Sequence, residues 1–359
     1  MTGTSMDGLD AALVRIEGAG LTMRATLLDS VTASLESVRE RLSRLAAGEA
    51  MTVERVVDLN HRYSQLHVSA VQRLLGQRRA DLVVVHGQTV FHRPPLSWQM
   101  ISAPLIAHAI GAPVVFDLRA ADLAAGGQGA PITPLADWIV YAHDAKSRTI
   151  VNLGGFANYT QLPARSASAS GMSGIRAGDI CVCNLLLNRL ADQFLGRSFD
   201  DRGVVARSGR PIARLEALVR EGLEEQSRSG RSLGTGDDDL MHSVLDRQRS
   251  DEPQDHAPED VLCSVVHALA RVIAAAVSGA DEVVLAGGGA RHEYLVERIE
   301  AEAGRPCMLS SKLGVPVEFR EAMEMAVLGA LSQDRIPITL PQVTGVREPA
   351  PRAGVWVYP

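Results

Sequence analysis

The chain has 359 residues, of which 46% are hydrophobic and 22% are charged, and its formal net charge is −6. This acidic balance argues against a nucleic-acid-binding protein, whose surface is typically basic. Because the length exceeds that of one typical hydrophobic core, we expect two domains.

The first predicted element is a hairpin whose glycine-rich turn covers residues 3–8, with the sequence GTSMDG. An alternating apolar strand is predicted over residues 11–16, and its return strand over 24–30. Glycine permits positive φ and close approach of a ligand, so the N–H groups and hydroxyls of this turn are suited to bind an anion. An ordinary hairpin turn is the alternative.

Residues 34–75 show helical periodicity, interrupted near Gly48, and two short apolar strands follow at 81–85 and 112–116. Polar side chains come directly after each strand, where open α/β sheets keep their ligands. These polar residues are His86, Gln88 and Thr89 after the first strand, and Asp117, Arg119, Asp122 and Gln128 after the second. The alternatives are a histidine satisfied within its turn and a solvated loop.

A domain boundary is expected in the proline-containing segment 131–134, ahead of a helix over residues 135–142. A strand over residues 149–153 then runs into Gly154 and Gly155, the head of another hairpin. This turn is similar to the opening one. The two turns together suggest a duplicated fold that holds phosphates between its halves.

Asp179 comes shortly before a predicted helix over residues 185–195. A carboxylate near a helix start is favoured by the helix dipole, so Asp179 is either an ordinary cap or a base at a functional site. Residues 164–174 are predicted to form a loop. Residues 223–260 are charged and are predicted to form a loop and a mobile, surface-exposed helical insert, with the acidic residues 237–239 in solvent.

A buried helix is predicted over residues 261–278, followed by a strand over 281–286 and three glycines at 287–289. A strand that passes through glycines into a helix lets a flat or phosphorylated ligand lie against the backbone. A further helix over residues 322–331 carries Glu324 as a candidate inward-facing acid.

Apolar segments and cysteines bear on the compartment. The most apolar long segment contains His267 and Arg271, so it is interpreted as a buried helix and not as a membrane span. No charged-then-apolar leader begins the chain, and we therefore expect a cytoplasmic protein. The four cysteines do not form a disulfide framework at this length, and Cys181-x-Cys183 lacks a second closely spaced pair. Buried thiols and no metal site are expected.

The motifs in combination resemble those of the anhydro-N-acetylmuramic acid kinases, and the resemblance runs almost end to end. The motifs that carry it are GTSMDG at 3–8, HGQT at 86–89, DLR at 117–119, GGQGAP at 126–131, NLGGFAN at 152–158, GGGAR at 287–291, AME at 322–324 and LPQVTG at 340–345. The implied fold is α/β: two actin/hexokinase/Hsp70-like (ribonuclease H-like) lobes around a cleft, with mixed sheets flanked by helices. The implied lobes are residues 1–134, with the tail 336–359 packing on them, and residues 135–335.

The resemblance also implies an activity. A base deprotonates a water that attacks the anomeric carbon of the 1,6-anhydro ring, and the released O6 takes the γ-phosphoryl group of ATP. The product is N-acetylmuramic acid 6-phosphate, formed in the recycling of cell-wall peptidoglycan. Mg²⁺ and a homodimer are implied, and no nucleic acid or membrane is expected as a partner.

Residue roles follow from matching the motif positions. The expected base is Asp179. The residues expected to bind ATP are Gly3, Thr4, Ser5, Met6, Asp7, Gly8, Asn152, Gly154, Gly155, Asn158, Gly287, Gly288, Gly289 and Arg291. The residues expected to line or support the sugar site are His86, Gln88, Thr89, Arg119, Asp122, Gln128 and Glu324.

Three segments depart from the family pattern. Members usually have DTGPGN where this chain has DICVCN at 179–184, and the segment 231–236 lacks the usual Gly-Arg-Glu ending. Members also have a strand leading into the first loop, so we expect either a start further upstream or a loop held mainly from its C-terminal side. The first two departures concern the sugar. The alternatives are therefore a kinase of another anhydrosugar, such as levoglucosan, and a catalytically weakened ATP-binding protein.

Overall fold

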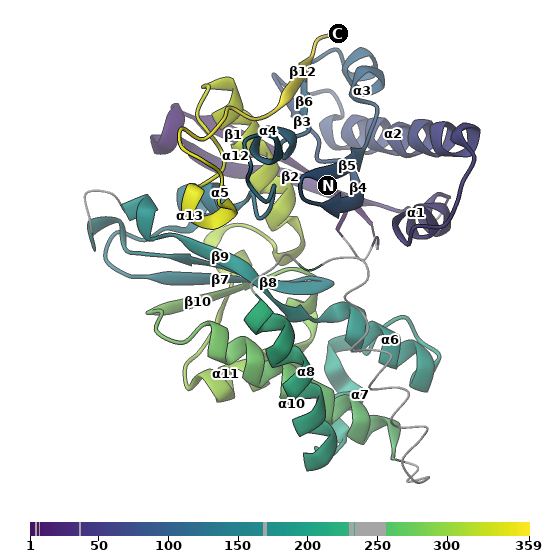
Figure 1. The fold of residues 1–359 in the computed structure, drawn as a ribbon, viewed down its shortest axis with the longest axis vertical. Helices are drawn as coiled ribbons and strands as arrows, with labels where there is room; N and C mark the ends of the chain where they lie inside the picture. Colours follow the sequence, from purple (N-terminus) through teal and green to yellow (C-terminus); the bar gives the residue numbers. More distant parts are fainter. Residues whose placement is uncertain (4–5, 7, 36, 168–170, 230–232, 234–255) are drawn as a thin grey trace. The chain divides into compact units, whose positions relative to one another are not determined.

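The computed structural model describes the chain except for residues 4–5, 7, 36, 168–170, 230–232 and 234–255. The described residues form two compact units (Figure 1). Unit 1 contains Met1–Ala142, Ser166–Arg176 and Leu313–Pro359, and unit 2 contains His143–Arg165 and Ala177–Lys312. Both units combine strands with helices, which confirms the α/β class. The lobe boundaries expected from the sequence stay predictions.

The described strands of unit 1 form two antiparallel hairpins and one small mixed sheet. The hairpins are β1 (Leu9–Glu17) with β2 (Arg24–Ala33), and β4 (Gln88–Arg93) with β5 (Leu96–Met100). In the mixed sheet, β6 (Val114–Phe116) is central, parallel to β3 (Val83–Val84) and antiparallel to β12 (Val355–Val357). The apolar runs before His86 and Asp117 are therefore strands, as the sequence predicted, although both are short.

Helices of unit 1 cover these strands. They are α1 (Arg39–Ala46), α2 (Val53–Leu75), α3 (Ala103–Ile110), α4 (Ala120–Ala124), α5 (Pro134–Tyr141), α12 (Arg320–Gln333) and α13 (Pro341–Thr344), with short 3₁₀ turns η1 (Gly20–Thr22), η3 (Gly171–Gly174) and η7 (Val317–Phe319). Helix α2 begins at a cap in which Thr52 accepts a hydrogen bond from the N–H of Arg55. Its buried Leu59 and Tyr63 join Leu9 of β1 and Leu42 of α1 in one hydrophobic cluster.

Unit 2 is built on a five-stranded sheet in the order β11-β10-β7-β8-β9; β7, β8, β9 and β10 are labelled in Figure 1. The strands are β7 (Arg148–Leu153), β8 (Phe156–Leu162), β9 (Arg176–Val182), β10 (Glu282–Ala286) and β11 (Met308–Leu309). β7 pairs with β8 as an antiparallel hairpin and with β10 in parallel. Its residues Thr149–Leu153 are all buried, as expected for a central strand.

Helices of unit 2 pack around α10. They are α6 (Asn184–Leu195), α7 (Val204–Ser208), α8 (Ala213–Ser229), α10 (Pro258–Ala276) and α11 (Glu293–Ala303), with 3₁₀ turns η2 (Arg165–Ala167), η4 (Asp201–Gly203), η5 (Gly288–Arg291) and η6 (Ser310–Leu313) near or within the unit. α10 contacts α6, α7, α8 and α11 and buries most of its residues, which confirms the predicted buried helix. No described helix is both long and apolar enough to cross a bilayer.

Some sequence expectations are wrong in detail. Residues 223–229 are helical, as expected, but they are the end of helix α8 and not a separate surface-exposed insert, since Leu223 is fully buried. The acidic residues 237–239 lie outside the described part of the chain. The three glycines do not open an α-helix directly: η5 comes first, and α11 begins only after His292, whose Nδ1 accepts from the N–H of Leu295.

Candidate functional site

The turn between β7 and β8 lies against the start of helix α6. The carbonyl oxygen of Gly154 accepts a hydrogen bond from the N–H of Asn184 at 3.0 Å, and that of Gly155 accepts from the N–H of Cys183 at 2.8 Å. In a trans peptide the N–H points opposite to the C=O. The N–H groups of Gly155 and Phe156 therefore point away from α6, which is the arrangement by which a turn offers donors to an anion.

The three glycines after β10 pack on the same turn. A Cβ on Gly289 would lie 2.6 Å from Asn184 Oδ1 and 2.8 Å from the carbonyl oxygen of Leu153. Gly287 has φ of +82°, and its Cβ would lie 2.8 Å from the same carbonyl oxygen. The Asn184 side chain holds this junction, since its Nδ2 donates to that oxygen at 3.0 Å. Glycine is required here by close backbone approach.

Of the residues predicted to bind ATP, unit 2 therefore brings several together. Asn152 lies one residue before the end of β7 and pairs in register with Asn158 of β8. Gly154, Gly155, Gly287 and Gly289 meet beside Leu153 and Asn184. Gly288 is adjacent, and Arg291 is exposed at the end of η5. From the sequence, Asn184 was noted only as the last residue of the segment 179–184, where it matches the family pattern. Its role in joining the two glycine turns could not be foreseen from the sequence.

We expect Gly289→Ala to lower the stability of the protein by about 1–3 kcal/mol, because the added methyl group overlaps a backbone carbonyl that cannot move freely. Thermal unfolding followed by circular dichroism measures the loss. Gly288→Ala is the matched control, since the nearest atom to its Cβ is 4.0 Å away and its φ is not positive. Equal melting temperatures for the two variants would contradict the packing described here.

Asp179 lies inside strand β9 and not near the start of α6, so the capping interpretation is wrong. The N-cap of α6 is Cys183, which makes no side-chain cap. The N–H of Leu233 donates to Asp179 Oδ2 at 2.6 Å and orients the carboxylate. The strand continues because Ile180 and Val182 are β-branched residues that favour extended backbone, where the family pattern has threonine and proline.

The residues that follow Asp179 are core residues. Ile180, Cys181, Val182 and Cys183 are each 0% exposed. Burial raises the pKa of the Cys181 thiol well above its usual value and that of Cys183 to about 12, so both thiols are protonated at neutral pH. The expected buried environment is confirmed for these two cysteines and for Cys263, whereas Cys307 is partly exposed.

The predicted phosphate loop at the chain's start closes a hairpin in unit 1. Thr2 pairs with Leu9 in an antiparallel bridge, and the N–H of Asp10 donates to the carbonyl oxygen of Met1 at 2.9 Å. Thr4, Ser5 and Asp7 lie outside the described residues. Met6 has φ of 51° and its side chain is buried in the hydrophobic cluster of α1 and α2. Gly3, Met6 and Gly8 are therefore suited to contact a nucleotide only through their backbone groups.

His86 and Arg119 form the centre of the predicted sugar-side residues in unit 1. Arg119 Nε donates to His86 Nε2 at 3.0 Å, and His86 Nδ1 lies 2.9 Å from the carbonyl oxygen of Gly87. The ring is therefore neutral, with its proton on Nδ1. Burial, aided by the charge of Arg119, lowers the pKa of His86 to about 3. The interpretation of His86 as a histidine satisfied within its turn is confirmed in part, because one ring nitrogen bonds the next residue.

The other sugar-side residues differ in exposure. Gln88 is 2% exposed, and its Oε1 accepts from the hydroxyl of Thr2 at 2.7 Å, which ties the opening loop to β4. Thr89 is partly buried beside Gln99, and Gln128 is exposed. Asp122 is fully buried with both carboxylate oxygens bonded within the protein, so it supports this region without lining it.

Glu324 is also a buried supporting residue. It is 1% exposed on α12 and lies 2.7 Å from Arg320 Nε, while Arg320 bonds Asp137 of α5 through two nitrogens. Burial raises the pKa of Glu324 well above its usual value, with Arg320 opposing. The partly buried acid of this helix is Glu321. Burial raises the pKa of Glu321 above its usual value, although the charges of Arg320, Arg119 and the Met1 ammonium group oppose this shift. Helical spacing cannot separate these two acids, because they are three positions apart.

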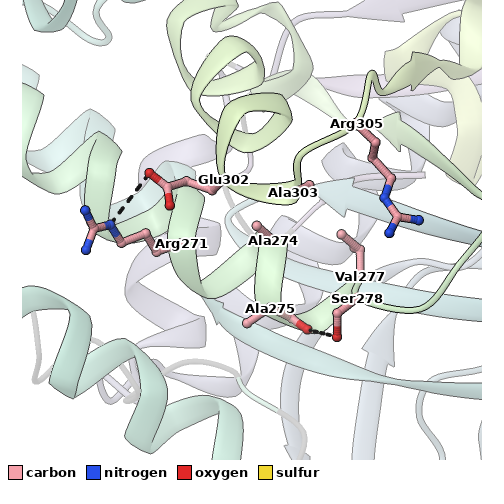
Figure 2. A pocket seen from close by; sticks show the side chains of 8 residues that line it. All are labelled: Arg271, Ala274, Ala275, Val277, Ser278, Glu302, Ala303 and Arg305. Atoms are coloured by element: carbon pink, nitrogen blue, oxygen red, sulfur yellow. Dashed lines mark hydrogen bonds and ion pairs between the residues drawn. The ribbon is translucent and has the colours of Figure 1, made fainter.

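Cavities large enough to hold a ligand lie elsewhere within each unit. Figure 2 shows one of about 270 Å³ at the C-terminal ends of α10 and α11, lined by Arg271, Glu302 and Arg305 among others. Arg271 pairs with Glu302 at 3.7 Å and with Glu216 at 3.0 Å, which balances its charge. None of the residues predicted to bind ATP or sugar lines this cavity. The residues predicted to bind ATP or sugar are therefore glycine turns in unit 2 and, in unit 1, the opening turn and side chains of which several are buried.

Comparisons with known proteins agree with the motifs. The chain matches the family described as anhydro-N-acetylmuramic acid kinase over residues 1–358. A protein of that name from Synechococcus sp. (strain WH7803) is 32% identical over 371 residues, covering 96% of this chain and 95% of the relative. One from Cyanothece sp. is 33% identical over 383 residues, covering 100% and 98%.

A solved structure is also similar. Component A of the Acidaminococcus fermentans (R)-2-hydroxyglutaryl-CoA dehydratase aligns with a TM-score of 0.43 and 12% identity, covering 88% of this chain and 96% of that one. Similarity at this level carries no functional inference.

Proposed function

The chain belongs to the anhydro-N-acetylmuramic acid kinase family, and from this premise we infer that it is an ATP-dependent sugar kinase of peptidoglycan recycling. It opens the 1,6-anhydro ring of anhydro-N-acetylmuramic acid with water and phosphorylates O6, giving N-acetylmuramic acid 6-phosphate. The match covers nearly the whole chain, so the alternatives of another anhydrosugar or a weakened ATP-binding protein are not favoured.

Asp179 is the group proposed to start the reaction. Its carboxylate accepts a proton from water, the water oxygen bonds to the anomeric carbon, and the bond from that carbon to O6 breaks. O6 then carries the electron pair that attacks the γ-phosphorus of ATP, and ADP leaves. A general base of this kind contributes about 10²–10⁴-fold to a rate. The hydrogen bond from the N–H of Leu233 supports the assignment, because it holds one carboxylate oxygen at 2.6 Å and so fixes the side chain.

Backbone turns are proposed to hold the nucleotide. The observation that carries this proposal is the junction of Gly154–Gly155, Gly287–Gly289 and Asn184 at the end of β7. Turns of this kind offer N–H donors to phosphate and close approach to a flat base. In unit 1, Arg119 supplies a fixed guanidinium and His86 a neutral ring, which suit the carboxylate and hydroxyl groups of a muramyl sugar.

Mg²⁺ is proposed to accompany ATP, where it neutralises charge on the transferred phosphoryl group. The described residues contain no cluster of three or more histidine, cysteine, aspartate or glutamate side chains suited to a metal. Mg²⁺ usually keeps several waters and binds through phosphates with one or two carboxylates. A homodimer in the cytoplasm is proposed from the family resemblance alone, and sedimentation of the purified protein tests the dimer.

Sugar-dependent ADP release tests the proposed function. Purified protein is mixed with ATP, Mg²⁺ and anhydro-N-acetylmuramic acid, and ADP is followed with and without the sugar. We expect release only when the sugar is present, with levoglucosan as the control sugar. ADP release with levoglucosan but not with the muramyl sugar would contradict the proposed substrate. ATP binding without any sugar-dependent ADP release would contradict the proposed kinase activity.

A further inference from the structure

Hydrogen bonds connect helix α13, in the C-terminal part of unit 1, to the residues after strand β3. Thr344 Oγ1 donates to Asp122 Oδ1 at 2.8 Å, and Asp122 Oδ2 accepts from the N–H of Gly129 at 2.7 Å. The carbonyl oxygen of Gly129 accepts from Arg119 Nη1 at 2.8 Å, and Arg119 Nε donates to His86 Nε2 at 3.0 Å. A residue near the end of the chain is thereby linked to two sugar-side residues.

Asp122 is the junction of this hydrogen-bonded chain. It is 0% exposed and Thr344 is 1% exposed, so neither is positioned to contact a substrate. The glycine loop at 126–129 wraps closely around the carboxylate: a Cβ on Gly127 would lie 2.1 Å from Asp122 Oδ2. A buried carboxylate must have both oxygens bonded to be tolerated, and here Thr344 and Gly129 supply those bonds.

Helix α13 also holds the same loop through its backbone. The carbonyl oxygen of Thr344 accepts from the N–H of Gln128 at 2.8 Å. The helix begins at Pro341 and ends at Gly345, which has φ of 71°. Thr344 therefore fixes the loop at two points, through its own carbonyl and through Asp122.

Arg119 depends on this loop for its direction. A guanidinium on a long side chain loses rotamer freedom when it is held, and two fixed acceptors hold it here, the Gly129 carbonyl and His86 Nε2. A shift of the loop removes one of these acceptors and so changes the direction in which the side chain is held. We propose that Thr344, acting through Asp122, is a positioning residue that sets Arg119 and His86 for binding the sugar. This proposal rests on the proposed function, in which those two residues contact the sugar.

Thr344→Val tests the proposal, because valine keeps the size of threonine and lacks the hydroxyl. We expect KM for the sugar to rise about tenfold, since small misplacements of binding groups have effects of this order, while KM for ATP changes by less than about twofold. Thr344→Ser restores the hydroxyl and is expected to restore KM. Gln342→Ala is the matched control on the same helix: Gln342 is exposed and its Nε2 bonds the carbonyl oxygen of Met172 at 2.7 Å, outside the glycine loop.

A purely structural role would give another pattern. The melting temperature and the active fraction would fall, both KM values would stay at wild-type levels, and the proposal would be overturned. Should Thr344→Val not fold, Asp122→Asn tests the same link at nearly constant size, and an unchanged KM for the sugar in that variant also overturns it. Arg119→Lys separates the two levels of inference. If Arg119→Lys raises KM for the sugar and Thr344→Val does not, only the positioning role of Thr344 is contradicted. If the wild-type protein shows no sugar-dependent ADP release, the proposed function itself is contradicted.

Discussion

Asp179→Asn is expected to lower kcat by about 10²–10⁴-fold, the usual contribution of a general base, with the affinity for ATP nearly unchanged. The amide cannot take a proton from water, but its oxygen can still accept the hydrogen bond that the N–H of Leu233 gives to Asp179 at 2.6 Å. The side chain therefore keeps its place while its chemistry is removed. Steady-state ADP release measures kcat, and titration of a fluorescent ATP analogue measures the affinity.

The control for this variant is Asp192→Asn. Asp192 is exposed on α6 of the same unit, 67% by side chain, and lies 3.9 Å from Arg189. We expect wild-type kinetics because an exposed pair of this kind contributes little. Wild-type turnover in Asp179→Asn would refute the base assignment. A loss of ATP affinity equal to the loss of turnover would instead indicate that Asp179 supports the nucleotide turns.

Arg320→Met is expected to destabilise unit 1 by about 3–5 kcal/mol, because it leaves two buried carboxylates without their cation. Arg320 is 2% exposed and contacts Asp137 at 2.6 Å and Glu324 at 2.7 Å. Although burial opposes the charged form, the two carboxylates raise the pKa of Arg320, which therefore stays protonated in the core. Methionine fills similar space but supplies no donor. Urea denaturation followed by far-ultraviolet circular dichroism measures the loss.

Glu324→Gln is the matched comparison within the same cluster. It replaces one of the two buried acids around a single cation by a neutral amide of the same size, so we expect a neutral or stabilising change. Strong destabilisation by Glu324→Gln would show that Arg320 needs both carboxylates. The variant also tests the sugar-site assignment of Glu324, which its 1% exposure makes a supporting role. A rise in KM for the sugar at unchanged stability would indicate direct contact.

The elements around the site could be predicted because their signals are local. An apolar run ending in His86, another ending in Asp117, and glycines between apolar runs at Gly154–Gly155 each identify a strand end or a hairpin turn within a few residues. The buried helix α10 was equally evident from its composition. The family was identified in the same way, because motifs are contiguous in the sequence.

Asp179 shows where local reasoning failed. A nearby helix start suggested a cap, whereas the β-branched residues Ile180 and Val182 were the better signal and indicated that the strand continues.

Which groups each polar side chain bonds was decided only by the tertiary structure. Asp122 and Glu324 had sequence positions compatible with contact to a sugar, yet both are buried. Asp122 is held by a residue far along the chain, and Glu324 is held by Arg320, which in turn bonds a distant residue of α5. Thr344 is 222 residues from Asp122, and Arg320 is 183 residues from Asp137. A buried carboxylate is tolerated only when distant donors reach it, and periodicity carries no information about which donors those are. The sequence by itself therefore determined the family, the glycine turns and the strands that lead into them, while packing decided which acids are buried and held by distant donors.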